Sequence, residues 1–339
     1  MIARILFVSD LHKRYSDSSS IKGQLKSQMA IQEDIIAAVS RFGITHIIIM
    51  GDWYDRGFHG IGQAYGAMEM DRRISAAVNG EVYLCVGNHL YLERDDNPEL
   101  YIIQPNDLIR PSIDIPVPEK PIFKMVNNLQ FGPVLISFFH FSKMNKNYVA
   151  HRANDIKFHI GVYHDDSCVP GYVAEMDGFT SKSSVSYMND IYRNVDIAMH
   201  GHIHSKVGAI TYELNTGRKV PMFIPGSLGI TQNKESFKHQ FVQLPIVEID
   251  DNYDVIVKLA QFSTHMELLR FYATKKKKKE VITDVQDVQF TSNSVATRSL
   301  ADYMTLRGYS PTQLRLIDAA GNGTLNLGTA VYIMSEVPQ

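Results

Sequence analysis

Five stretches of the sequence place side chains that bind metal ions directly after a short apolar run. In residues 47–55, IIIMGDWYD, the apolar run ends before Gly51 and is followed by the carboxylates Asp52 and Asp55. The other four stretches repeat this pattern, and the five together supply two carboxylates, one amide oxygen, four imidazoles and no sulfur: Asp10, His12, Asp52, Asn88, His164, His202 and His204. This donor set suits divalent ions of borderline to hard character, such as manganese, iron or zinc.

The number of candidate ligands indicates a centre with two ions. Seven side chains exceed what one ion binds, so we expect two ions about 3.5–4 Å apart, with Asp52 as the bridge and with His202 and His204 able to serve different ions. Two such ions favour hydrolysis of phosphoesters, because they lower the pKa of a bridging water and neutralise charge on the phosphoryl oxygens. His89, next to Asn88, is expected to protonate the leaving oxygen or to stabilise the pentavalent state.

The elements that must position these side chains alternate between strands and helices. The apolar run at residues 47–50 has the length and β-branched composition of a buried strand. Residues 28–41 and about 64–78 have apolar side chains at helical spacing, and Gly43 is expected to end the first helix. This order predicts an α/β fold with parallel strands and right-handed crossovers. Such sheets bind ligands at the carboxyl ends of their strands, where the candidate metal ligands lie.

Further strands are expected after residue 130. Their apolar runs occupy, in order, residues 132–140, 157–164, 195–199, 222–230, 239–249 and 253–262. The last three are expected to form a further sheet. Of two polar stretches, residues 94–121 predict an extended excursion over the surface, and residues 165–186 predict a connector long enough to be a functional loop.

The composition excludes several classes of protein. With 34 basic and 36 acidic residues the formal net charge is −2, so contact with nucleic acid or membrane needs a local patch. The two cysteines, Cys85 and Cys168, lack paired spacing, which excludes a thiolate zinc site and suggests a reducing compartment. Residues 1–8 do not resemble a signal peptide, and no apolar run approaches the roughly 20 residues of a membrane span. We therefore expect a cytoplasmic protein without membrane contact.

The composition changes near Thr274, and we expect three regions: a dimetal phosphoesterase domain at residues 1–250, a capping or linker segment at 251–295 and a helix pair at 296–339. The linker carries a lysine run that forms either a solvated connection or a DNA contact: Lys275, Lys276, Lys277, Lys278 and Lys279. Gly308 ends the first C-terminal helix, and the capping box at residues 310–313 begins the second. Such short helices do not persist alone in water, so their apolar side chains must pack on this chain or on a partner: Leu300, Met304, Leu314 and Ile317.

The ligand stretches resemble the five ordered motifs of the calcineurin-like metallophosphoesterases. The matching residues are, in order, Asp10-x-His12, Gly51-Asp52-x-x-Asp55, Gly87-Asn88-His89, His164 and Gly201-His202-x-His204. Within that superfamily, Ile224-Pro225-Gly226-Ser227-Leu228 and Lys238-His239-Gln240-Phe241 are similar to the segment after the last motif of SbcD-type DNA repair nucleases. The resemblance implies a sandwich of two sheets flanked by helices (α-β-β-α), two manganese ions and hydrolysis of DNA by an exonuclease or endonuclease. It also implies an SMC-like (SbcC-type) ATPase partner for the C-terminal helices, and it allows a homodimer.

One position departs from the family pattern. The family usually has an acidic residue after the catalytic histidine, whereas this sequence has Leu90. Because a carboxylate normally fixes the tautomer of such a histidine, the candidates to replace it are Asp55, Glu93 and Asp95.

Two alternatives to a DNA nuclease stay open at this point. One is a phosphatase or phosphodiesterase that acts on small nucleotides, and it differs from a nuclease in the pocket rather than in the metal chemistry. The other is a metal-holding scaffold with weakened catalysis, which the replacement by Leu90 suggests. His140 and His200 also end apolar runs near the expected site, and they are candidates for contacts with a metal ligand or with substrate.

Overall fold

The computed structural model describes residues 1–14, 21–55, 61–94, 97–102, 122–141, 148–176, 184–230 and 241–271. The lysine run, the C-terminal helix pair and part of the expected linker lie outside these residues. The expectations for Lys275–Lys279 and for Leu300, Met304, Leu314 and Ile317 therefore stay predictions. Within the described part of the chain, no helix is both long and apolar enough to cross a membrane.

The first sheet has five strands in the order β14-β13-β1-β3-β4. Its parallel centre consists of β1 (Ala3–Val8), β3 (His46–Ile49) and β4 (Val82–Leu84). The hairpin of β13 (Phe241–Ile249) and β14 (Val255–Ser263) joins β1 in the antiparallel direction. The parallel centre is the part that the alternation of strands and helices predicts.

The second sheet has six strands in the order β11-β12-β10-β9-β8-β7. They are β7 (Asn128–Phe131), β8 (Val134–Phe139), β9 (Phe158–Tyr163), β10 (Ile197–His200), β11 (Gly208–Glu213) and β12 (Lys219–Ile224). The four central strands β12, β10, β9 and β8 are parallel, and the two edge strands are antiparallel to their neighbours.

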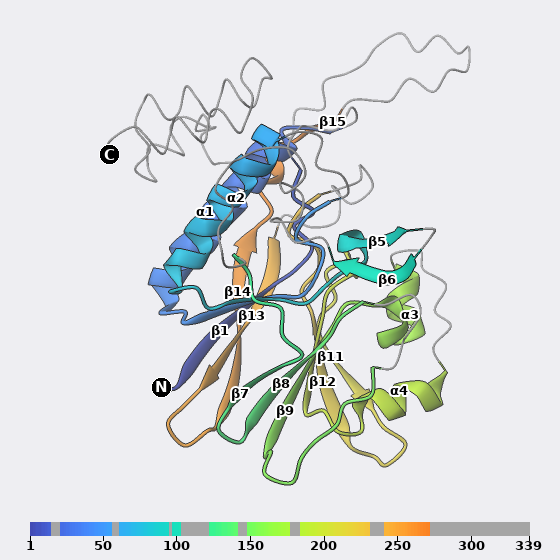
Figure 1. The fold of residues 1–339 in the computed structure, drawn as a ribbon. Helices are drawn as coiled ribbons and strands as arrows, with labels where there is room; N and C mark the ends of the chain where they lie inside the picture. The colour runs from blue at the N-terminus through green and yellow to red at the C-terminus, as the bar shows by residue number, and fades with distance from the viewer. Residues whose placement is uncertain are drawn as a thin grey trace, which may run out of the picture.

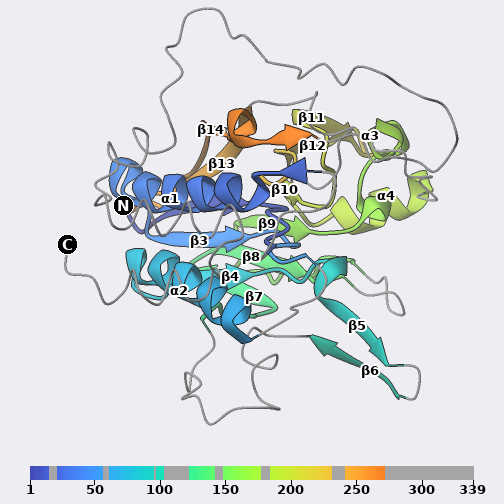
Figure 2. The ribbon, with the colours of Figure 1, turned by 90° about the horizontal axis from the view of Figure 1, so that it is seen from above.

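The two sheets pack face to face, with helices on both outer faces (Figures 1 and 2). Helices α1 (Gln24–Phe42) and α2 (Ile61–Ala77) cover the first sheet, and α3 (Gly171–Met176) and α4 (Val185–Tyr192) lie against the second. Side chains alternate between the layers: on β1, Leu6 and Val8 face the helices, whereas Ile5 and Phe7 face the second sheet. This arrangement confirms the expected α-β-β-α sandwich.

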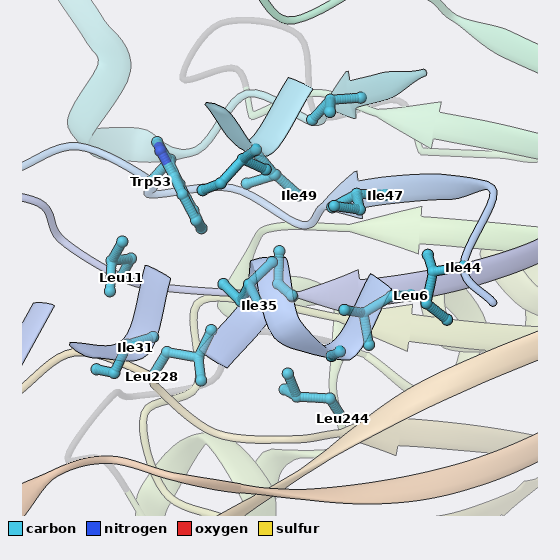
Figure 3. Close-up of a cluster of buried hydrophobic side chains, with 14 of the residues drawn as sticks. Leu6, Leu11, Ile31, Ile35, Ile44, Ile47, Ile49, Trp53, Leu228 and Leu244 are labelled. Atoms are coloured by element: carbon cyan, nitrogen blue, oxygen red, sulfur yellow. The ribbon is translucent and has the colours of Figure 1, made fainter. Parts of the chain in front are cut away.

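The core under α1 and α2 reaches as far as the loops that follow the strands. Figure 3 shows Ile31 and Ile35 of α1 in the same cluster as strand residues such as Ile47. Leu11 and Trp53, which follow β1 and β3, belong to this cluster and are fully buried. The loops at this edge of the sheet are therefore anchored by apolar side chains.

Helix α1 ends as predicted but begins earlier. Gly43 has a left-handed φ of 61°, and its N–H donates to the carbonyl of Val39. The helix begins at Gln24 rather than at residue 28, because its first turn buries polar side chains that an apolar pattern cannot reveal. Gln24 donates to the carbonyl of Ile230 (2.7 Å), and Ser27 donates to that of Thr264 (2.9 Å).

Several sequence-based boundaries require correction. Residues 255–263 form β14 of the first sheet rather than part of a linker, and β13 and β14 complete that sheet instead of a separate one. The expected connector at 165–186 contains η2 (Asp166–Cys168), α3 and the start of α4. The expected excursion after residue 94 begins inside a hairpin of β5 (Tyr91–Arg94) and β6 (Asn97–Ile102).

The end of the described chain returns to α1. Strand β15 (Arg270–Phe271) pairs with β2 (Ile21–Lys22), and η4 (Met266–Leu268) contacts α1. Just before η4, the buried His265 places Nε2 2.7 Å from Asp34 on α1 and Nδ1 3.2 Å from Glu267. Burial alone would lower the pKa of His265, but the two carboxylates outweigh it and raise the pKa to about 9.

This clamp predicts a pH-dependent part of the stability. Because the pKa of His265 is about 9 in the folded chain and about 6.5 in an unfolded one, its contribution is fully present below pH 6.5 and is lost as the pH rises through 9. We expect His265→Gln to reduce the free energy of unfolding by about 2–3 kcal/mol more at pH 6 than at pH 9.5. Urea denaturation at both pH values, with the exposed His151→Gln as control, measures this difference. A pH-independent difference between the wild type and His265→Gln would contradict it.

Candidate metal centre

Loops at the carboxyl ends of five strands bring the candidate ligands together. The loops contribute Asp10 and His12 after β1, Asp52 after β3, Asn88 after β4, His164 after β9, and His202 and His204 after β10. Both sheets therefore supply ligands to one centre. All seven side chains predicted from the sequence lie within this set of loops.

Three glycines let the loops close around His164. A Cβ atom added at Gly51 would lie 1.9 Å from Nδ1 of His164, and one added at Gly201 would lie 2.1 Å from the carbonyl oxygen of Met50. A Cβ atom added at Gly87 would lie 2.1 Å from Oδ1 of Asp52 and 2.7 Å from Nε2 of His164. Each of these glycines directly precedes a candidate ligand. Neighbouring atoms approach its backbone so closely that a side chain would not fit.

The first group of donor atoms consists of Asp52, His164 and His202, which lie within 4.8 Å of one another. Nδ1 of His164 lies 2.7 Å from the carbonyl of Met50, which accepts its proton and directs Nε2 toward the other ligands. Nε2 of His164 lies 3.1 Å from Oδ2 of Asp52 and 3.3 Å from Oδ1 of Asn88. Asn88 therefore adds its amide oxygen to this group.

The second group consists of Asp10, His12 and His204. The Nε2 atoms of His12 and His204 lie 2.9 Å apart, and Oδ1 of Asp10 lies 3.7 and 3.9 Å from them. The Asp10 carboxylate is held by the N–H of His202 (3.0 and 3.2 Å) and by the hydroxyl of Ser9. His202 and His204 thus belong to different groups, as the expectation of two ions requires.

The backbone of the ligand loops is unusual. Asp10, His12, Asp52 and His202 have left-handed φ values of 50°, 46°, 39° and 71°. This conformation costs a non-glycine residue about 1–2 kcal/mol, so the surrounding contacts must maintain it. One such contact is the N–H of His12, which donates to the carbonyl of Asp52 at 2.9 Å.

The electrostatics of the centre combine a buried ion pair with neutral imidazoles. Burial alone would raise the pKa of Asp52, but the charge and hydrogen bond of His164 outweigh it and hold this pKa below its usual range. Burial alone would lower the pKa of His164, but Asp52 raises it to about 9. Burial lowers the pKa values of His12 and His202 to about 3. These two imidazoles are neutral at physiological pH, which is the form that binds a metal ion.

The donor set fits two divalent ions. Both carboxylates are buried, so their negative charge requires compensation. The buried Nδ1 of His12 has no hydrogen-bond partner among the residues that the structure describes. Neither Cys85 nor Cys168 belongs to a candidate metal group in the described part of the chain, so the ligands are oxygen and nitrogen atoms.

His89 lies beside both groups and is oriented by Asp55, and donor atoms of His12, Asp55 and His89 also lie within 4.8 Å of one another. Its Nδ1 is 2.8 Å from Oδ1 of Asp55, and its Nε2 is 3.9 Å from Oδ2 of Asp52. Its ring contacts the ring of His12 edge to face, and its side chain is 25% exposed. Of the three carboxylates considered as replacements for the acidic residue at position 90, Asp55 makes this contact. Asp55 also pairs with the guanidinium of Arg14.

The segment after the last ligand supports the first ligand loop. The hydroxyl of Ser227 donates to the carbonyl of Asp10 (2.7 Å), and the N–H of Gly229 donates to the same carbonyl (3.0 Å). Gln28 of α1 donates to the carbonyl of His12 (2.8 Å). In the sequence, only a resemblance marks the segment at residues 224–228. A buried glutamine in an amphipathic helix gives no sequence signal.

His140 and His200 have structural partners. His140 accepts from the N–H of Val86 (3.0 Å) and lies 3.1 Å from the carbonyl of Val126, so it supports the end of β4. His200 is buried, lies 3.0 Å from the hydroxyl of Tyr192 and stacks on Tyr163. Neither histidine belongs to a candidate metal group among the described residues.

Comparisons with known proteins identify the family of the chain. The sequence model of the family described as calcineurin-like phosphoesterase matches residues 3–206. None of the curated proteins matches the chain.

Among solved structures, the chain is similar to a NAD nucleotidase from Haemophilus influenzae, with 12% identity, a TM-score of 0.39 and coverage of 83% of this chain but only 54% of that one. It is similar to the phosphoesterase Yfce from E. coli, with 13% identity, a TM-score of 0.33 and coverage of 77% and 100%. It is also similar to a dimetal phosphatase from Danio rerio, with 10% identity, a TM-score of 0.39 and coverage of 78% and 99%.

The packing around His164 predicts that Gly87→Ala disrupts the centre. The added methyl would lie 2.1 Å from Oδ1 of Asp52, so Asp52 must move, and we expect the free energy of unfolding to fall by about 1–3 kcal/mol. Calorimetric titration with Mn²⁺ should show weaker binding. The control is Gly80→Ala, where the methyl meets open space but the backbone has a φ of 81°. This variant should lose stability without a change in Mn²⁺ binding, and wild-type Mn²⁺ affinity in Gly87→Ala would contradict the interpretation.

Proposed function

The chain belongs to the calcineurin-like phosphoesterases, and we propose that it is a two-metal phosphodiesterase that acts on DNA. The observation that carries the proposal is the position of His89, whose Nε2 lies 3.9 Å from Oδ2 of Asp52 while Nδ1 is held by Asp55. When the P–O bond of a phosphodiester breaks, the sugar oxygen leaves as an alkoxide, which requires a proton. A fixed histidine beside the ligands is suited to supply it.

Each group of donor atoms is proposed to hold one ion. Asp10, His12 and His204 would hold the first, and Asp52, Asn88, His164 and His202 would hold the second, with Asp52 shared between them. When bound, divalent ions of this kind activate a water as nucleophile and offset the negative charge of the phosphoryl group. Manganese is our first choice of metal, and iron and zinc satisfy the same donor set.

His89 is proposed as the general acid. In the proposed acid form, Nδ1–H donates to Asp55 and Nε2–H points toward the ligand groups. The Nε2 proton can then pass to the leaving oxygen. Asp55 fixes the ring in this orientation through its 2.8 Å contact. The contact favours an active enzyme over a weakened scaffold, because a carboxylate other than residue 90 orients His89.

DNA is preferred as substrate over small nucleotides because of the resemblance of the segments at 224–228 and 238–241 to SbcD-type nucleases. That resemblance also supports an SMC-like ATPase as partner of the C-terminal helices. The charge of the lysine run supports its contact with DNA, and a homodimer is compatible with the same reading. These remain proposals, and co-purification of the full chain with such an ATPase would test the first of them.

The substrate class is tested by digestion of end-labelled single- and double-stranded DNA with Mn²⁺. We expect metal-dependent cleavage by the wild type and none by Asp52→Asn, because asparagine keeps the shape of the bridging residue but loses its charge. The exposed Asp155→Asn serves as control and should cleave normally. Cleavage of a nucleotide ester but not of DNA would select the small-molecule enzyme. Substantial activity in a folded Asp52→Asn protein would contradict the two-metal assignment.

The role of His89 is tested by separating metal binding from turnover. We expect His89→Ala to bind both ions normally and to lose about 10²–10⁴-fold in rate. Asp55→Asn should lose less, because the histidine remains but is held more loosely. Leu90→Asp should change the rate little, since Nδ1 of His89 is already paired. Loss of one bound ion from His89→Ala in calorimetry would make His89 a ligand instead of the acid.

A further inference from the structure

The loops after β1 and β3 stay paired beyond the ends of their strands. The N–H of Lys13 donates to the carbonyl of Trp53 (2.8 Å), and the N–H of Asp55 donates to the carbonyl of Lys13 (3.0 Å). Lys13 and Tyr54 form an isolated parallel bridge. Residues 10–14 and 51–55, here called the loop pair, therefore form one hydrogen-bonded unit that carries His12, Asp52 and Asp55.

A carboxylate outside the metal centre binds both halves of the loop pair. Asp71 of α2 is fully buried. Its Oδ1 accepts from Nζ of Lys13 (2.9 Å) and from Nε1 of Trp53 (3.0 Å), and its Oδ2 accepts from the hydroxyl of Tyr54. Each of these three donors belongs to a residue directly beside His12, Asp52 or Asp55 in the sequence.

The contacts of Asp71 are directional and charged. Lys13 is only 4% exposed, so its ammonium group requires a buried counter-charge. The indole and phenol donors lie within the apolar core under α1 and α2, where loss of a hydrogen bond to a charged acceptor is costly. Removal of the Asp71 charge therefore acts directly on the positions of Lys13, Trp53 and Tyr54.

The loop pair also contains three of the residues with left-handed backbone, Asp10, His12 and Asp52. Such residues keep this conformation only while their surroundings fix it. A loop pair released from α2 can relax toward ordinary backbone angles, and this relaxation would move the side chains of His12 and Asp52.

We propose that Asp71 is a positioning residue of the metal centre, whose carboxylate locks the register of the loop pair and thereby the placement of His12, Asp52 and Asp55. The consequence for metal binding rests on the proposed function. The locking of the loop pair can be measured without metal.

The experiment compares Asp71→Asn with Glu33→Gln. Glu33 of α1 is also buried and binds Arg73 of α2 (3.0 Å), at the interface of the same two helices but not at the loop pair. Amide hydrogen exchange of the metal-free full chain is followed in peptides that cover residues 10–14 and 51–55, and Mn²⁺ affinity is measured by calorimetry. Thermal unfolding of both variants is recorded, so that their exchange and Mn²⁺ affinity can be compared in relation to the stability that each variant loses.

We expect exchange in the loop pair of Asp71→Asn to accelerate about tenfold or more, as local opening becomes easier, and Mn²⁺ binding to weaken roughly 10–100-fold. Glu33→Gln, at a similar loss of thermal stability, should leave both quantities at wild-type values. Wild-type exchange in Asp71→Asn, or equal acceleration in Glu33→Gln, would overturn the proposal and indicate a general contribution to core stability.

Two milder variants cover the case in which Asp71→Asn does not fold. Tyr54→Phe and Trp53→Phe each remove one neutral donor to Asp71, and each should accelerate exchange at residues 51–55 to a smaller degree. Unchanged exchange in both would overturn the proposal. If the wild type hydrolyses no phosphodiester, the proposed function fails, whereas the exchange data still decide whether Asp71 locks the loop pair.

Discussion

The close approach of strand ends around His164 is the constraint on which the rest of the structure depends. His164 follows β9 of the second sheet, yet its Nδ1 binds the carbonyl of Met50 at the end of β3 in the first. Gly51, Gly87 and Gly201 surround this imidazole so closely that no Cβ fits at any of them without displacement. The contacts of His164 that join the two sheets at this edge therefore also bring the candidate metal ligands together.

A second consequence of this convergence is that charge is concentrated where solvent is excluded. Asp10 and Asp52 are fully or nearly fully buried, and within the described ranges their partners are imidazoles, a serine hydroxyl and backbone N–H groups. Such compensation leaves the carboxylate oxygens available to cations. The basic side chains Lys13 and Arg14 lie one step further out and bind Asp71 and Asp55, so they support the loops without competing for the ligands.

The ligands could be predicted from the sequence because each directly follows a strand, and the chemistry of a donor set is local information. The sheet to which each later strand belongs could not be predicted in the same way. Both faces of β13 are buried along most of its length, so its apolar residues identify a strand but not its neighbours. Buried polar residues on helices were also missed: Gln28 and Asp71 look like the solvent side of an amphipathic helix, and only their tertiary partners distinguish them. For the carboxylate that orients His89, the sequence offers three candidates. It cannot select Asp55 among them, because the two residues are 34 positions apart and only the fold brings them into contact.

The long separations within the Asp10 loop have a consequence for biosynthesis. Asp10 is held by the N–H of His202 and through its carbonyl by Ser227, at separations of 192 and 217 residues. The strand that precedes it, β1, gains its second neighbour only from β13. A nascent chain therefore carries its first metal ligands long before it can hold them in place. Closure of such distant contacts is slow compared with helix formation, so the centre is completed only after residue 227 has been synthesised, and earlier exposure to metal would meet an unformed site.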